Sequence, residues 1–227
     1  MTMRFELVAF DLYGTLLDVS GLARLLEPFA GPDSASVLAR WRKAQLERTW
    51  REKAYEPFDV VTARALEEVA PGLEAKARAG MCKTWLSLPA FPDAAATLES
   101  LRKARVRSAI LSNGTPAMIR AALDSAGLQV DEVRSVDEVR AYKPDPRVYA
   151  LLPRQRTLFV SGNGWDAEGA KRNGLTVAWI DRGMPAPGVR PDFHVHSLSD
   201  VAAIVIAPAE EAEERSPLDR SDPRRID

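Results

Sequence analysis

Short apolar segments recur along the chain without strict alternation of apolar and polar positions. They span residues 5–10, 106–111, 157–160 and 177–180, and continuous apolar runs of this length are typical of strands buried on both faces of a parallel sheet. Helical patterns with recognisable end signals lie between them, at residues 93–105, 115–127 and 166–173. This alternation predicts an α/β fold, a Rossmann-like core built on a doubly wound parallel sheet.

Residues 19–88 interrupt this alternation, because they carry only helical patterns, at 33–54, 59–70 and 73–86. We therefore predict an all-helical cap at 19–88, inserted into a core domain formed by residues 1–18 and 89–207. The last segment, residues 208–227, contains 11 charged residues and three prolines. It is predicted to be a charged, flexible tail.

The composition narrows the function without defining it. Apolar residues make up 46% of the chain, charged residues 28%, and the formal net charge is −1, so there is no excess of positive charge for binding nucleic acid or an anionic membrane surface. No apolar run approaches the roughly 18 residues needed to span a bilayer, and the N-terminus lacks a signal-peptide pattern. The single cysteine, Cys82, cannot form an intrachain disulfide, which favours a cytoplasmic location.

Polar side chains follow the predicted strands at their carboxyl ends, where folds of this class bind ligands. Taken singly, each has an ordinary interpretation: an Asp after a strand is a turn or helix cap, and a Lys before Pro is a solvated surface residue. The ordinary interpretations do not account for all of them following strands of one sheet, so together they predict an active site. The segments are Asp11-Leu12-Tyr13-Gly14-Thr15, Ser112-Asn113-Gly114, Lys143-Pro144-Asp145-Pro146 and Ser161-Gly162-Asn163-Gly164-Trp165-Asp166.

These motifs, in the order DLYGT, LSNG, YKPDPRVY and SGNGWD, resemble the haloacid dehalogenase superfamily and, within it, the L-2-haloacid dehalogenases. The resemblance extends to about Arg182 and includes WRKAQLERTW in the predicted cap. It implies hydrolysis of short L-2-haloalkanoic acids to D-2-hydroxy acids and halide, through an aspartyl ester on Asp11. It also implies that no cofactor is needed and that the chain forms a homodimer.

Two positions argue against the magnesium-dependent phosphatases that make up most of the superfamily. Those enzymes begin their first motif DxDGT, where Tyr13 stands here, and place a metal-binding Asp where Gly162 stands. Only Asp11 and Asp166 remain, which is too few acidic ligands for a hard divalent ion. Without a cation, a phosphate dianion would be repelled by both carboxylates, so we expect no metal in the active site.

The predicted catalytic residues are a nucleophilic carboxylate and the groups that keep it ionised and orient it. Lys143 is the cation expected to keep Asp11 ionised, and Asp166 is expected to activate the hydrolytic water. Thr15 would aim the nucleophile. The full set is Asp11, Thr15, Lys143, Ser161, Asn163 and Asp166.

The predicted substrate-binding residues come from both parts of the chain. Backbone amides after Asp11 and the Ser112 hydroxyl are expected to bind the substrate carboxylate. The resemblance assigns halide binding to Arg42, Asn113 and Trp165, and Arg42 shares a helical face with the apolar Leu46. The full set is Leu12, Tyr13, Arg42, Leu46, Phe58, Ser112, Asn113, Tyr149 and Trp165.

Other interpretations stay open at this point. One is a related hydrolase that attacks a phosphate ester or another small carbon electrophile through Asp11. Another is a small-acid-binding protein without turnover. His194 and His196 share a strand face with metal-like spacing, but two ligands do not make a site. Three further expectations are a helix shortened to fit residues 150–157, a smaller cap between residues 50 and 58, and weaker activity where Gly162 replaces a common Ser.

Overall fold

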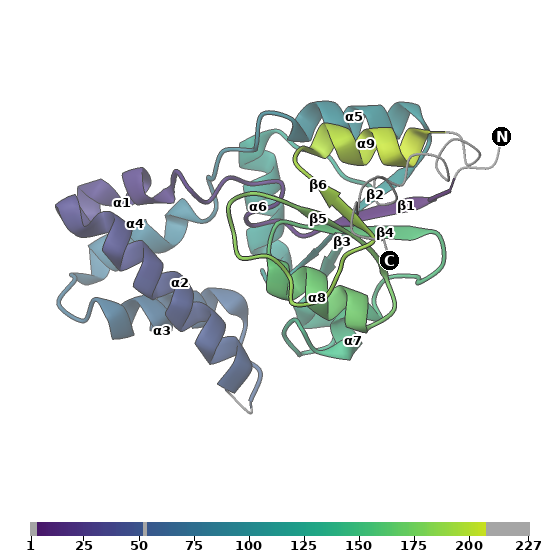
Figure 1. Cartoon of the computed structure of the whole chain (residues 1–227). Helices are drawn as coiled ribbons and strands as arrows, with labels where there is room; N and C mark the ends of the chain where they lie inside the picture. The colour runs from purple at the N-terminus through teal and green to yellow at the C-terminus, as the bar shows by residue number, and fades with distance from the viewer. Residues whose placement is uncertain (1–3, 52–53, 208–227) are drawn as a thin grey trace, which may run out of the picture.

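The computed structural model describes residues 4–51 and 54–207, so the charged tail predicted at 208–227 lies outside the described residues. Six parallel strands form one sheet in the order β3-β2-β1-β4-β5-β6 (Figure 1). This order runs outward in both directions from the β1/β4 pair, which confirms the predicted doubly wound fold. The strands are β1 (Leu7–Phe10), β2 (Arg107–Ser112), β3 (Glu132–Ser135), β4 (Thr157–Ser161), β5 (Thr176–Ile180) and β6 (Phe193–Val195).

Helices cover both faces of the sheet, which explains why its central strands are continuously apolar. One apolar cluster joins the sheet to α5, α6 and α9, and a second joins the opposite face to α7 and α8. All four residues of β1 and all five of β4 are buried. The helices are α5 (Ala94–Lys103), α6 (Pro116–Ala126), α7 (Pro146–Tyr149), α8 (Gly164–Arg172) and α9 (Leu198–Ile206).

A bundle of four helices lies between β1 and α5 in sequence and beside the sheet in space (Figure 1). The indole N–H of Trp41 donates to the Thr62 carbonyl at 2.8 Å and ties two of these helices together. The bundle consists of α1 (Leu22–Ala30), α2 (Ser34–Arg51), α3 (Phe58–Val69) and α4 (Ala75–Thr84), with a 3-10 turn at Gly31–Asp33. The domain limits at residues 18 and 89 stay a prediction.

Several elements differ from those predicted. The edge strand β3 was not predicted, because it reads EVRS and an edge strand needs no continuous apolar run. The edge strand β6 was expected only as the strand face that His194 and His196 share. Helices α1 and α9 were also not predicted; α1 contains Pro28, which breaks its helical pattern. Asp93 stands at the start of α5, but its carboxylate accepts hydrogen bonds from Arg182 and the Leu198 N–H instead of capping the helix.

Three smaller expectations have mixed outcomes. The shortened helix expected at residues 150–157 is wrong: the four-residue α7 ends at Tyr149, and turns lead from there to β4. Cys82, which has no partner for an intrachain disulfide, is half-buried against the core. Within the described residues, no helix combines the length and apolar character that crossing a bilayer requires.

Candidate active site

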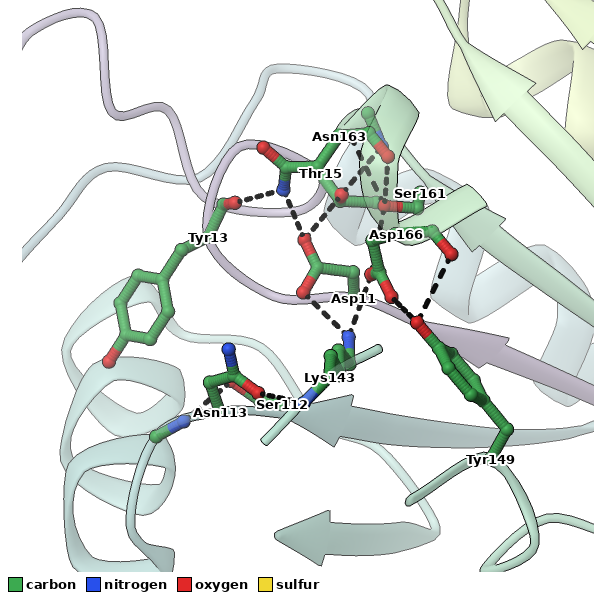
Figure 2. A network of polar contacts seen from close by, with 12 residues as sticks. Asp11, Tyr13, Thr15, Ser112, Asn113, Lys143, Tyr149, Ser161, Asn163 and Asp166 are labelled. Atoms are coloured by element: carbon green, nitrogen blue, oxygen red, sulfur yellow. Dashed lines mark hydrogen bonds and ion pairs between the residues drawn. The ribbon is translucent and has the colours of Figure 1, made fainter. Parts of the chain in front are cut away.

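The carboxylate of Asp11 lies at the carboxyl end of β1 and is only 7% exposed. Its Oδ2 accepts hydrogen bonds from the Thr15 hydroxyl at 2.9 Å and from Asn163 Nδ2 at 2.9 Å, and its Oδ1 accepts from Lys143 Nζ at 3.0 Å (Figure 2). Among the described residues, Oδ1 therefore has one donor where Oδ2 has two. Oδ1 keeps the lone pair that a nucleophile needs.

Lys143 is 1% exposed, so its ammonium group depends on the carboxylates around it. Its Nζ donates to Asp11 at 3.0 Å and to Asp166 Oδ2 at 2.8 Å. Burial alone would lower the pKa of Lys143, but the attraction of the two carboxylates outweighs it and holds the pKa above its ordinary value. The lysine thus stays charged and bridges the two acids.

Asp166 is fully buried in the first turn of α8. The Tyr149 hydroxyl donates to its Oδ1 at 2.8 Å, and the Ser161 hydroxyl donates to its Oδ2 at 3.1 Å. Burial raises the pKa of Asp166, an effect that Lys143 partly offsets and that the Asp11 charge reinforces. A carboxylate whose pKa is raised is a better proton acceptor than an ordinary aspartate.

Two glycines let the loops approach closely enough to form this network. A Cβ on Gly162 would overlap the Gly14 carbonyl oxygen, and the Gly162 N–H donates to the Thr15 hydroxyl at 2.8 Å. A Cβ on Gly169 would lie 2.5 Å from the Tyr149 hydroxyl. Glycine is therefore required at position 162, because the two backbone segments approach too closely there for a side chain.

A cavity of about 60 Å³ opens beside Asp11, between the strand ends and the helical bundle. It brings together nine of the predicted residues: Asp11, Tyr13, Arg42, Leu46, Phe58, Ser112, Asn113, Asn163 and Trp165. The ring of Trp165 meets that of Trp50 from α2 edge to face, 5.9 Å between centroids. Residues separated by more than 100 positions thus line one small space.

Arg42 is the cation that α2 contributes to this cavity. Its guanidinium makes no hydrogen bond or ion pair with any residue in the described ranges. Burial lowers its pKa, an effect that the charge of Asp11 opposes. A partly buried cation without a protein partner favours an anionic ligand.

Three predicted substrate-binding residues have other positions or roles. The Leu12 side chain is fully buried in the core cluster, outside the cavity, so only its backbone can contact a ligand there. Tyr149 also lies outside the cavity and contacts Asp166. The Asn113 carboxamide, which does line the cavity, accepts from the Lys143 backbone N–H at 3.1 Å through its Oδ1, leaving its NH₂ group to donate.

Sequence reasoning missed Gln45 and Trp85, which also line the cavity. Gln45 Nε2 is held by the Thr62 hydroxyl at 2.9 Å. The Trp85 indole N–H and the Tyr13 hydroxyl are buried without a hydrogen-bond partner in the described chain, and their rings meet edge to face at 5.5 Å. In the helical pattern predicted for residues 73–86, Trp85 has the spacing of an ordinary core residue. The sequence therefore gives no signal that it lines a cavity.

The magnesium ion typical of the superfamily does not fit these residues. Tyr13 points its ring away from Asp11 (Figure 2), and Gly162 offers no side-chain ligand. The position between the two remaining carboxylates already holds the Lys143 ammonium, at 3.0 and 2.8 Å. A divalent cation there would face a like charge and only two acidic ligands.

Comparison with known proteins agrees with this geometry. The sequence model of the haloacid dehalogenase-like hydrolases matches residues 5–174. The (S)-2-haloacid dehalogenase of Pseudomonas sp. strain YL is 39% identical over 225 residues, which cover 91% of this chain and 97% of that enzyme. Haloacetate dehalogenase H-2 of Moraxella sp. strain B is 33% identical over 220 residues, 89% of this chain and 98% of that enzyme.

A solved structure resembles the whole described fold. It is the L-2-haloacid dehalogenase from Xanthobacter autotrophicus with chloropropionic acid covalently bound, with a TM-score of 0.82, 32% identity, and coverage of 90% of this chain and 100% of that one. The fold and the buried Asp11 site define a haloacid dehalogenase-like hydrolase. Within that class, the chain belongs to the L-2-haloacid dehalogenase family.

Proposed function

We propose that this protein hydrolyses short L-2-haloalkanoic acids to D-2-hydroxy acids and halide, through an ester on Asp11. One observation carries the proposal: Asp11, hydrogen-bonded to the Lys143 ammonium, faces a cavity of about 60 Å³ whose other wall presents Arg42, a cation without a partner among the described residues. The relatives named (S)-2-haloacid dehalogenase and haloacetate dehalogenase support the same reaction.

In the first step, Asp11 Oδ1 attacks the α-carbon of the bound acid. An oxygen–carbon bond forms on the face opposite the halogen, the carbon–halogen bond breaks, and halide leaves with the bonding electrons, so the configuration inverts. Thr15 and Asn163 hold Oδ2 at 2.9 Å each, which fixes the direction of the Oδ1 lone pair.

Separate groups bind the negative charge of the substrate carboxylate and that of the leaving halide. Backbone N–H groups of the loop after Asp11 and the Ser112 hydroxyl bind the carboxylate in this proposal. Arg42, the NH₂ group of Asn113 and the edge of Trp165 stabilise the developing halide, and their position on the cavity lining supports that role. Leu46 and Phe58 supply an apolar wall that excludes water from the nucleophile.

In the second step, water attacks the Asp11 side-chain carbon of the ester. Asp166 accepts a proton from that water and returns it to Oδ1 as the bond between the side-chain carbon and Oδ1 breaks, so that Oδ1 leaves in the product hydroxyl group. Lys143 stabilises the negative charge that develops on the tetrahedral intermediate. Tyr149 and Ser161 orient Asp166 through their hydrogen bonds at 2.8 and 3.1 Å.

The small cavity favours the shortest substrates. A volume of about 60 Å³ corresponds to about four water molecules. Haloacetates and 2-halopropionates, with about five or six non-hydrogen atoms, match it best, and longer chains require the apolar wall to move. Dimerisation and a cytoplasmic location stay predictions from the resemblance and the single cysteine.

The test is halide release from L- and D-2-chloropropionate in the presence of a chelator. Release from the L-isomer alone, unaffected by chelation, is the expected result, and Asp11→Asn should abolish it. Release that requires magnesium, or faster cleavage of p-nitrophenyl phosphate, would establish the alternative hydrolase. Binding of the acid without turnover would establish the small-acid-binding protein.

A further inference from the structure

The only two histidines of the chain, His194 and His196, lie exposed on β6 and just beyond its end. The sequence places them on one strand face but supplies no third ligand. The structure adds one: Asp181, which follows β5, offers a carboxylate oxygen, and the three ligand atoms all lie within 4.8 Å of one another. None of the three lines the catalytic cavity.

The pairing of β5 with β6 brings these residues together. The strands are parallel, with Trp179 opposite His194 and Ile180 opposite Val195, so the next pair is Asp181 and His196. The Asp181 N–H donates to the Val195 carbonyl at 2.9 Å and extends the ladder to that point. Because alternate residues of a strand share a face, Asp181 and both histidines project from the same face of this edge.

Contacts with neighbouring residues orient the side chains of His194 and Asp181. The His194 ring stacks on the Trp179 ring with centroids 4.5 Å apart and 24° between the planes, and the His196 ring lies 4.9 Å from that of His194. Asp181 Oδ1 accepts from the Gly183 N–H at 3.0 Å, which orients the carboxylate. In the described residues, neither imidazole donates to or accepts from another side chain.

We propose that Asp181, His194 and His196 bind a divalent transition-metal ion, with zinc the best match, and that water completes the coordination. Two imidazole nitrogens and one carboxylate suit borderline ions such as Zn²⁺, Ni²⁺ and Cu²⁺, whereas Mg²⁺ and Ca²⁺ require more oxygen ligands. Zinc bonds of about 2.0–2.1 Å in tetrahedral geometry separate ligand atoms by about 3.4 Å. Exposed side chains reach that spacing by small rotations.

Such an ion would join the edge strand to its neighbour. Strand β6 has three residues and contacts the sheet only through β5, and α9 follows it directly. An ion held by residues from both strands binds the folded form and not the unfolded one, so it stabilises the protein by mass action. The ion is structural here and takes no part in the reaction at Asp11.

The test is a calorimetric zinc titration of the untagged full chain at pH 7.5, because a histidine tag would itself bind the metal. One zinc per chain is expected, with both imidazole NMR signals shifting together, since no other histidine contributes. His194→Ala and His196→Ala should each weaken binding at least tenfold. Asp181→Asn should weaken it too, whereas Cys82→Ser, which removes the only thiol, should leave it unchanged.

A second readout is independent of affinity. Cu²⁺ bound at His194 should quench the fluorescence of the stacked Trp179, and Trp179→Phe should remove that part of the quenching. Halide release checks that every variant is folded. Zinc binding that survives the double histidine substitution, or a dissociation constant weaker than about 0.1 mM for the unsubstituted chain, overturns the proposal.

Discussion

The two walls of the catalytic cavity are built differently. On the sheet side, the cavity wall carries Asp11, and Lys143 and Asp166 lie outside the lining; all three are almost fully buried, and each makes at least two charge-assisted hydrogen bonds within the protein. On the helical side, Arg42 reaches the same cavity with no hydrogen-bond partner among the described residues. The charged groups on the sheet side have their hydrogen-bond partners before the substrate binds, whereas Arg42 on the helical side gains an anionic partner from the substrate.

This difference separates positioning from recognition. A network of fixed hydrogen bonds holds a nucleophile in a single geometry, which speeds a displacement that depends on alignment. An unpartnered cation gains its partner only as halide develops, so its binding energy is realised at the transition state and not in the free enzyme.

Removing the Lys143 ammonium that bridges Asp11 and Asp166 should lower both the activity and the stability of the protein. Lys143→Met leaves Asp11 and Asp166 buried without their cation, which should lower the free energy of unfolding by about 3–5 kcal/mol. Halide release should fall by at least about 10³-fold. Urea unfolding and steady-state kinetics measure the two effects, and a variant that keeps either near its original value contradicts the bridging role.

Removing the cation of the other wall should affect activity alone. Arg42→Gln should reduce kcat by about 10²–10³-fold, while the urea midpoint stays the same or rises slightly, because no described protein group loses a partner. Arg42→Lys is the matched control and should retain more activity than Gln. A large loss of stability in Arg42→Gln would mean that the two walls do not differ as described.

The pH dependence of turnover should show the raised pKa of Asp166. Asp166 must be ionised to accept a proton, so activity should fall on the acid side at a pH above the ordinary carboxyl range. Lys143, whose pKa is raised, keeps its charge and its stabilising effect up to a pH above the ordinary lysine range, and loses both as the pH rises further.

Tyr149→Phe tests whether the acid limb of the pH profile belongs to Asp166. It removes a hydrogen bond that lowers the pKa of Asp166, so the acid limb of the pH–kcat profile should move to higher pH, with kcat at its maximum reduced by about tenfold or less. A purely structural role for Tyr149 would lower kcat without moving the limb.

The smallest effect concerns loop packing. Gly162→Ala places a Cβ against the Gly14 carbonyl oxygen and should cost about 1–3 kcal/mol of stability, with a loss of activity because the Gly162 N–H supports Thr15. Gly72→Ala is the matched control, since nothing lies within 4 Å of its added Cβ. Equal stability of the two variants would contradict the close-approach argument.

The sheet-side wall could be predicted from the sequence, since its residues directly follow strands whose carboxyl ends meet at one edge. That reasoning located Asp11, Ser112 and Asp166 from local pattern alone. Lys143 lies in the connection between the second and third predicted strands, and its burial between two carboxylates becomes visible only in three dimensions.

The helical wall and the sheet edges were harder to predict, for physical reasons. Trp85 faces the cavity from the turn that follows α4, and the sequence pattern around it is that of any packed helix. Strands β3 and β6 lie at edges, where burial on one face gives no continuous apolar run. Asp181 lies close to His196 because of the register between β5 and β6. That register depends on how the two strands pair, so it cannot be read from the sequence of either strand alone.

The most direct test of the account is a single turnover of L-2-chloropropionate in H₂¹⁸O with enzyme in excess. If Asp11 forms the ester and water attacks its side-chain carbon, the product takes its new hydroxyl oxygen from the unlabelled Asp11, and the heavy oxygen appears in the Asp11 peptide by mass spectrometry. Heavy oxygen in the product lactate of that first turnover, with none in the peptide, would show direct attack by water and contradict the covalent role of Asp11.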